Sequence, residues 1–393
     1  MEKKELYIFN PENDLALAFG EEGYTAPPAA RQLRRDLQML PAWYAPCGST
    51  IMSENCGIDA EWLEEMRATF GVDISCMARN HLQNHQFEYK PWGWNLDLRR
   101  RLIGECVAEE QLPSVSYIDK LRELSHRAIT IKLHQYISSV INYPLPPCPV
   151  ELRTVGEVRE FEREYAQCYV KAPWSSSGHG VYRVLEPESR NFEIWTRGVI
   201  NRQGSVLCEA ALKVVQDFAM EYLCKNGEVT FAGYSVFSND AHSSFDSGIV
   251  SSREYLRGLI SSRIGDSAIL DSVKQAVQQF IAKEIAPSYD GYLGVDMMLY
   301  DDSGIVRINP CVELNLRMTM GAVTAIFGER YLKEGAVGVF KVTMSRSEAE
   351  RQAMKARFAQ NQAVTDGNRL VAGILPLTPV YADSTYYAYI EIL

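Results

Sequence analysis

The sequence has no run of about 18 apolar residues, the length that a membrane-spanning helix needs. Its first residues, MEKKELYIFNPEND, lack the apolar segment and cleavage site of a signal peptide, so we expect a cytoplasmic protein without a membrane partner. The nine cysteines include no CxxC pair, and their number is odd. This pattern favours reduced, mostly buried thiols over disulfides or a zinc site.

Positive charge is also scarce. The chain has 40 Lys and Arg against 50 Asp and Glu, which gives a formal net charge of −10. Binding to nucleic acid rests on clustered cations that face phosphates, so we expect no nucleic-acid partner. An acidic protein can still bind phosphates where a few cations converge in one cleft. With 393 residues, 46% of them hydrophobic, the chain is long enough for two or three cores.

The spacing of apolar residues predicts an α/β protein. ELYIFN at 5–10 is a strand, and Asn13 or Asp14 of the following PEND turn caps a helix. The aromatic stretch at 79–97 has no clean period and predicts a loop. Further expected elements are helices at 29–40, 60–70 and 268–286, strands at CYVKAP and GVYRV, and hairpins that turn at Asn226-Gly227 and at DDSG.

The stretch YVKAPWSSSGHGVYRV, residues 169–184, places one lysine at the end of an apolar strand, before a loop of small residues. Glycines let a backbone turn its N–H groups towards a phosphate, serines add short donors, and lysine adds a point charge. No GK[ST] closes the loop, so it is not a Walker A motif. The stretch predicts either a phosphate cover or an exposed hairpin rich in Ser and Gly. The phosphate cover would consist of Lys171, Ser175, Ser176, Ser177, Gly178 and Gly180.

A second polar group lies in GVDMMLY and VELNLRMTMG. Asp296, Glu313 and Asn315 carry the oxygen ligands that Mg²⁺ prefers where it also bridges nucleotide phosphates. Glu313 and Asn315 are two positions apart, so in a strand they project from the same face, and Arg317 continues that face. The alternative is that Glu313, Asn315 and Arg317 form the solvent side of an edge strand.

The order of these parts resembles the ATP-grasp superfamily of ligases. A lysine strand with a small-residue loop, a strand containing a glutamate, and a G-x-x-G-V-D hairpin that ends in E-x-N-x-R follow one another over about residues 115–325. The resemblance implies an α/β (α+β) fold. In this fold an N-terminal α/β domain is followed along the chain by two α+β subdomains, which grip a nucleotide. We expect these three units at 1–115, 116–205 and 206–393.

The resemblance also implies roles for single residues. Lys171 would contact the α-phosphate side of ATP, and Arg127, in ELSHRAIT, stands where these enzymes have an earlier phosphate-binding lysine. Asp217 would bind the ribose hydroxyls. The adenine hinge would be Glu209 with backbone groups of Ala211 and Leu212.

The implied metal ligands are Asp296, Glu313 and Asn315, with Arg317 beside the reacting carboxylate or phosphate. The separation of Asp296 from Glu313 is longer than these enzymes commonly show. Either a bulge at Pro310 and Cys311 absorbs the extra residues, or the first ligand is Asp301, Asp302 or Asn309.

The resemblance implies ATP and Mg²⁺ as cofactors and a ligase that activates a carboxylate as an acyl phosphate, releasing ADP and phosphate. Its partners would be small-molecule or peptide acids and amines, and the PEND turn and the aromatic loop at 87–94 would recognise the acceptor. One alternative is a small-molecule kinase that uses the same ATP site. Another is an inactive nucleotide-binding scaffold. No heptad pattern in the sequence indicates an oligomeric state.

Overall fold

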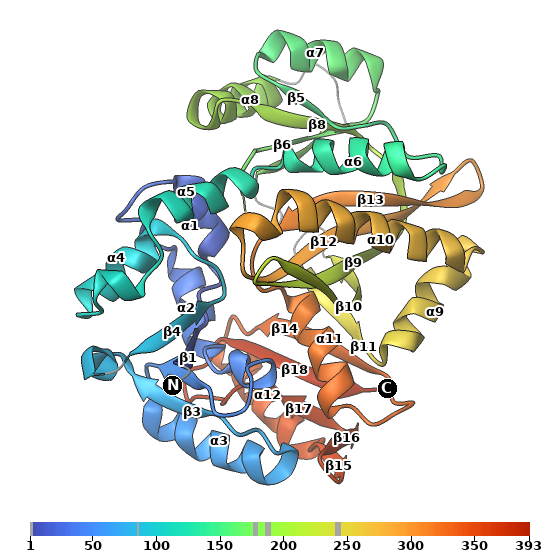
Figure 1. Cartoon of the computed structure of the whole chain (residues 1–393). Coiled ribbons are helices and arrows are strands. Elements are labelled where there is room, and N and C mark those ends of the chain that lie inside the picture. Colours follow the sequence, from blue (N-terminus) through green and yellow to red (C-terminus); the bar gives the residue numbers. More distant parts are fainter. Residues whose placement is uncertain (1–2, 85, 176–179, 185–189, 240–244) are drawn as a thin grey trace.

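The N-terminal part of the chain is a parallel sheet connected by helices (Figure 1). The computed structural model describes residues 3–84, 86–175, 180–184, 190–239 and 245–393. Within these ranges the first sheet has the strand order β3-β2-β1-β4, and every pair is parallel. Its elements are β1 (Lys4–Ile8), α1 (Asn13–Phe19), α2 (Pro28–Asp36), η1 (Leu40–Trp43), β2 (Thr50–Ser53), α3 (Cys56–Phe70), β3 (Ser75–Ala78), η2 (Arg79–Asn84), β4 (Phe87–Pro91), α4 (Leu96–Gly104) and η3 (Glu109–Gln111).

A small antiparallel sheet, at the top of Figure 1, contains the strand that ends at Lys171. Its described strands have the order β5-β8-β6-β7, and Val158, Val170 and Phe192 share one core between this sheet and its two helices. The elements are β5 (Val150–Leu152), α7 (Val155–Glu164), β6 (Cys168–Lys171), β7 (Val181–Val184), α8 (Arg190–Gln203) and β8 (Val206–Ala210).

The largest sheet is antiparallel and has the order β13-β12-β9-β10-β11-β14-β18-β17 in the described part of the chain. A separate two-stranded ladder of β15 and β16 lies near its C-terminal strands. The strands are β9 (Lys213–Lys225), β10 (Glu228–Asn239), β11 (Phe245–Val250), β12 (Gly291–Asp302), β13 (Ile305–Asn315), β14 (Gly338–Met344), β15 (Val364–Asp366), β16 (Arg369–Ala372), β17 (Ile374–Pro376) and β18 (Tyr386–Ile392). The helices are α5 (Val115–Leu124), α6 (Ile129–Val140), α9 (Arg253–Ile264), α10 (Ser267–Glu284), η4 (Ala286–Ser288), α11 (Met320–Tyr331) and α12 (Glu348–Gln360).

The strand pairing bears on where the units divide. Strand β8 pairs with β5 and β6, so residues 206–210 belong to the small sheet, although we expected a division after 205. Helices α5 and α6, expected with the small unit, share a core with the large sheet through Leu121, Ile137 and Met220. We therefore propose a small unit of about residues 150–210.

Trp43 joins the parallel layer to the C-terminal strands. Its ring is fully buried and lies edge-on to Phe70, with centroids 5.5 Å apart, and 5.2 Å from Phe327. Its indole Nε1 donates to the carbonyl of Leu377 at 2.6 Å. The N-terminal layer and the far end of the large sheet thus form one core, which fixes the first strands relative to the site.

Two expectations from the sequence are wrong, one about residues 87–91 and one about the burial of the cysteines. Residues 87–91, predicted as a loop, form β4, in which Phe87 and Tyr89 are buried while Glu88 points to solvent. The alternation was present, but the strand is short and lies among aromatic residues without a period. All nine cysteines are free as expected, but only four are buried, and Cys47 and Cys106 are exposed.

No helix in the described ranges has the length and apolarity to cross a membrane.

Candidate functional site

A cavity of about 580 Å³ opens between the small sheet, the large sheet and the N-terminal layer. Residues from distant parts of the sequence meet on its walls, so the fold gathers most of the predicted site into one space. The predicted residues that line it are Arg127, Lys171, Glu209, Leu212, Asp217, Asp296, Glu313, Asn315 and Arg317.

Alternation along the strands brings polar side chains to the cavity floor. Phe218 and Met220 of β9 lie in the core shared with α6 and α10, whereas Asp217 and Glu221 of the same strand line the cavity. Because successive side chains of a strand point to opposite faces, apolar and polar positions separate cleanly here. Asp296 of β12 faces the cavity for the same reason.

Asp296 and Glu313 are direct cross-strand partners. The register then shifts, because Met298 pairs with Asn309, so β13 uses four positions where β12 uses two. Pro310, which has no N–H to give to the ladder, lies in this bulge. The bulge explains the long sequence separation. Of the other proposed first ligands, Asp301 and Asp302 lie at the far end of the hairpin and pair with Lys213 and Arg307. Asn309, the third, lines the cavity, and its Oδ1 accepts the N–H of Cys311 at 3.4 Å.

The two facing carboxylates suit a divalent cation. Burial, and next the charge of Glu313, raises the pKa of Asp296 to about 7. Asn315 donates from Nδ2 to Asp296 Oδ2 at 3.0 Å, which adds an amide to the pair. Within the described residues no three His, Cys, Asp or Glu side chains form a metal-binding group. An ion here would take its other ligands from phosphate or water, as Mg²⁺ commonly does.

Arg127 connects the small sheet to the metal motif. Its side chain is buried, and Nη1 donates to the carbonyl of Ala172 and to Ser175 Oγ, both at 2.7 Å. Nη2 donates to Glu313 Oε1, also at 2.7 Å. Its Nε is buried and has no hydrogen-bond partner. The guanidinium therefore holds the loop end and one predicted metal ligand at the same time.

Lys171 ends β6 and is 8% exposed. Its Nζ forms an ion pair with Glu209 of the neighbouring strand β8. Glu209 was predicted at the adenine hinge, and here it is the partner of the predicted phosphate lysine. The N–H of Ala211 is donated to the carbonyl of Gln167 at 3.0 Å, which leaves only the carbonyl of Ala211 for a ligand.

The loop after Lys171 is closed at its base. The N–H of Ala172 donates to the carbonyl of Gly180 at 2.7 Å. Gly180 has φ +76°, and a Cβ there would lie 2.7 Å from the Cβ of Ser175, so both conformation and space require glycine. Ser175 lines a smaller cavity that adjoins Glu313. The other predicted loop residues, Ser176, Ser177 and Gly178, lie outside the described residues.

Arg317 has a partner that the sequence did not reveal. Its Nε donates to Asp14 Oδ2 at 2.7 Å, and its Nη2 donates to Asn315 Oδ1 at 3.0 Å. Asp14 and Asn13 were predicted as helix caps, but the N-cap of α1 is Glu12, which makes no side-chain cap bond. Asp14 instead links the N-terminal layer to the predicted site through its contact with Arg317.

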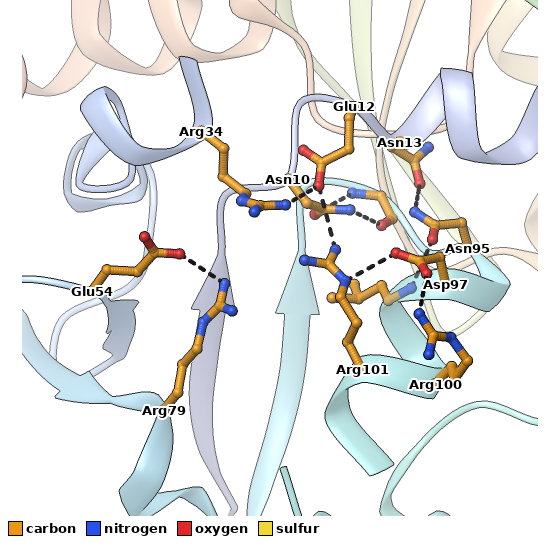
Figure 2. A network of polar contacts seen from close by, with 12 residues as sticks. Asn10, Glu12, Asn13, Arg34, Glu54, Arg79, Asn95, Asp97, Arg100 and Arg101 are labelled. Atoms are coloured by element: carbon orange, nitrogen blue, oxygen red, sulfur yellow. Dashed lines mark hydrogen bonds and ion pairs between the residues drawn. The ribbon is translucent and has the colours of Figure 1, made fainter. Parts of the chain in front are cut away.

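A polar network holds the turn after β1 in place (Figure 2). Asn10 donates from Nδ2 to the carbonyl of Gly93, after β4, at 2.8 Å. The buried Glu12 carboxylate contacts Arg34 of α2 at 2.5 Å and Arg101 of α4 at 3.3 Å. The carboxyl ends of β1 and β4 are thus tied together, which fixes the start of α1 and the carboxylate that it carries to the site.

Glu221 is a further cavity residue that we did not predict. It is 1% exposed, and its Oε2 accepts a hydrogen bond from Thr319 Oγ1 at 2.9 Å. Burial, and next the charge of Asp296, raises its pKa to about 8. In the sequence it stands inside the apolar run FAMEYL, where no local signal distinguishes it from a core position.

Three solved structures share the fold over nearly the whole chain. Biotin carboxylase from Campylobacter jejuni, in a β,γ-ATP complex, is 12% identical with a TM-score of 0.52, covering 100% of this chain and 88% of that chain. The biotin carboxylase domain of 2-oxoglutarate carboxylase from Hydrogenobacter thermophilus, with MgADP and bicarbonate, is 13% identical with a TM-score of 0.51, covering 100% and 87%.

The third is N5-carboxyaminoimidazole synthetase from Staphylococcus aureus with ADP, which is 12% identical with a TM-score of 0.51, covering 99% of this chain and 93% of that chain. By sequence, the chain matches no protein-family model and no curated protein. At these identities the likeness concerns the fold.

Proposed function

We propose that this chain, which has the ATP-grasp fold, is an ATP- and magnesium-dependent ligase. It would activate a carboxylate as an acyl phosphate and pass the acyl group to an amine or a similar nucleophile, releasing ADP and phosphate. One observation carries the proposal. Asp296 and Glu313 face each other in the same cavity as the buried cations Lys171 and Arg127.

The nucleotide would lie along the cavity floor. Asp217 lines the cavity and accepts a hydrogen bond from Asn239 at 3.1 Å on Oδ2, so its other oxygen could accept from ribose hydroxyls. Mg²⁺ held by Asp296, Glu313 and Asn315 would neutralise the charge that develops on the transferred phosphate.

Both phosphate-facing cations have carboxylate partners that a nucleotide would replace. Arg127 contacts Glu313, and Lys171 contacts Glu209. A phosphate offers each cation an equivalent anion, and the exchange would free the Glu313 carboxylate to bind the ion together with Asp296. Arg127 would keep its bond to the Ala172 carbonyl, so the loop would stay attached during the exchange.

Arg317 would orient the carboxylate to be activated, or stabilise the charge of the acyl phosphate. Asp14, Asn315 and the carbonyl of Met318 fix its guanidinium, so the remaining N–H of each Nη would be preset for an anion. The N-terminal layer would recognise the acceptor carboxylate. Pro11 and Trp92 of this layer line the cavity, which supports this role.

Product analysis tests this function. The purified protein is given MgATP and a panel of acids and amines, and ADP, free phosphate and organic products are measured, with Lys171→Ala as the site control. Phosphate release that requires both an acid and an amine supports ligation. A phosphorylated organic product would instead indicate the kinase alternative.

The inactive-scaffold alternative rested on the long spacing of the metal ligands. The bulge in β13 places Asp296 opposite Glu313 in spite of that spacing, which removes its main ground. A scaffold would bind ATP without dependence on magnesium, and Glu313→Ala would leave that binding unchanged.

A further inference from the structure

The cavity continues past the proposed metal ligands to an acid that the chemistry above does not use. Along β9, Ala219 lies opposite Asp296, and Glu221 lies opposite Gly294. With about 3.3 Å per strand residue, Glu221 lies roughly 13 Å from Asp217. Following the strand, the floor therefore presents the proposed ribose acid, then the metal pair, and then Glu221.

The fold makes room for this carboxylate. A Cβ at Gly321 would lie 2.1 Å from Glu221 Oε1, and a Cβ at Gly294 would lie 2.7 Å from Oε2. Gly294 of β12 and Gly321 of α11 thus leave a notch, and the Glu221 carboxylate fills it. Thr319, the N-cap of α11, fixes one oxygen through its hydroxyl.

The charges that line the cavity leave Glu221 without a cation of its own. The cations are Arg127, Lys171 and Arg317, and their respective ion-pair partners are Glu313, Glu209 and Asp14. Within the described ranges, no Lys, Arg or His lies within ion-pair distance of Glu221. Burial raises its pKa, and the more distant charge of Arg317 lowers it. A buried carboxylate is costly without a counter-charge, so the notch suits a cation that arrives with a ligand.

Besides the Thr319 hydroxyl and Ser235, which border the notch, the cavity also has apolar walls. Trp92, Leu33 and Met320 line the same cavity. The carbonyl of Trp92 accepts the N–H of Met318 at 2.9 Å, which places the N-terminal loop directly against the segment that carries Thr319. A ligand that puts a cation at Glu221 would therefore share the cavity with these apolar side chains.

We propose that Glu221 binds the ammonium group of the nucleophilic substrate, a primary amine carried on an apolar group. The proposal rests on the ligase function, because it places the amine next to the position where the acyl phosphate would form. It names a substrate class for an end of the cavity that neither the nucleotide nor the metal would occupy.

Calorimetry on the full chain with saturating MgADP tests it, with 2-phenylethylamine and its neutral analogue 2-phenylethanol as probes. We expect the amine to bind the wild type at least about tenfold more tightly than the alcohol, as a charge-assisted contact implies. Glu221→Gln keeps the shape and the Thr319 bond, and we expect it to abolish that preference while MgADP affinity stays within about twofold. Glu105→Gln, a partly buried acid of the N-terminal layer, is the matched control and should change neither value.

Gly321→Ala provides a second route to the same answer, because its methyl group would displace the carboxylate from the notch. It should also lower the amine affinity. If Glu221→Gln binds MgADP normally and still prefers the amine, or if the wild type binds MgADP but not the amine, Glu221 is not the ammonium site and the ligase proposal stands. If the wild type does not bind MgADP, the proposed function fails and this inference fails with it.

Discussion

The Asp14 carboxylate accepts a hydrogen bond from Arg317 Nε at 2.7 Å, across 303 positions of sequence. The two side chains are 18% and 17% exposed. This pair ties the first helix to the end of the E-x-N-x-R motif. Because Arg317 also holds Asn315, the N-terminal layer helps to set the geometry of the proposed metal site.

Asp14→Asn tests this connection. The substitution leaves a largely buried guanidinium without its anion, so we expect the free energy of unfolding to fall by about 1–3 kcal/mol. Glu64→Gln, which removes one of the two carboxylate partners of the exposed Arg67, should cost less than about 0.5 kcal/mol. Urea unfolding measures both, and equal losses would show that the Asp14–Arg317 pair has no special weight.

Arg127→Lys separates charge from geometry. Lysine keeps the charge but cannot reach the Ala172 carbonyl and Glu313 together, so we expect MgATP affinity to fall by about tenfold. Arg163→Lys, at an exposed position of α7, is the control and should bind MgATP normally. Normal binding by Arg127→Lys would mean that the fork geometry is unimportant.

The raised pKa of Asp296 predicts a pH-dependent stability. Its ordinary value is 3.8 and its value here is about 7, so the protonated side chain stabilises the fold at low pH, and this contribution is lost as pH rises through about 7. Without metal, Asp296→Asn should exceed the wild type in unfolding free energy by on the order of 1–4 kcal/mol at pH 8. The difference should shrink by pH 5.

Urea unfolding at several pH values in chelator measures this difference. Asp301→Asn should show the opposite sign, because the hydrogen bond from Lys213 lowers the pKa of Asp301. A gap between Asp296→Asn and the wild type that does not vary with pH would contradict the account.

Gly180→Ala tests the base of the loop. Both Gly180 and Gly204 have positive φ, but only at Gly180 would a Cβ meet neighbouring atoms within 4 Å. We expect each Ala variant to lose about 1 kcal/mol of stability from backbone strain. Only Gly180→Ala should also weaken MgATP binding. Nucleotide titration of both variants decides, and equal affinities would count against a role for the loop.

The fold class was predictable because its signals are local. The lysine strand, the hairpin at Asn226-Gly227 and the E-x-N-x-R strand each combine alternation with a turn residue, and their order resembled ATP-grasp enzymes, whose fold the chain has. The sequence alone allows the bulge at Pro310 only as one of several alternatives, because register is set by the pairing of two strands.

The contacts that complete the site were not predictable in this way. Arg127 meets Glu313 across 186 positions, and Asp14 looked like a helix cap, since nothing nearby in sequence indicates Arg317. Glu221 stands in an apolar run, and only the cavity shows that it faces away from the core. Such partners are decided by tertiary packing.

The central claim is that Lys171 and the Asp296–Glu313 pair form one site for MgATP. Calorimetric titration of MgATP into wild type, Lys171→Ala and Lys283→Ala tests it most directly, because Lys283 is an exposed lysine of α10. We predict magnesium-dependent binding by the wild type and Lys283→Ala, and at least about tenfold weaker binding by Lys171→Ala. Unchanged affinity in a folded Lys171→Ala protein would contradict the account.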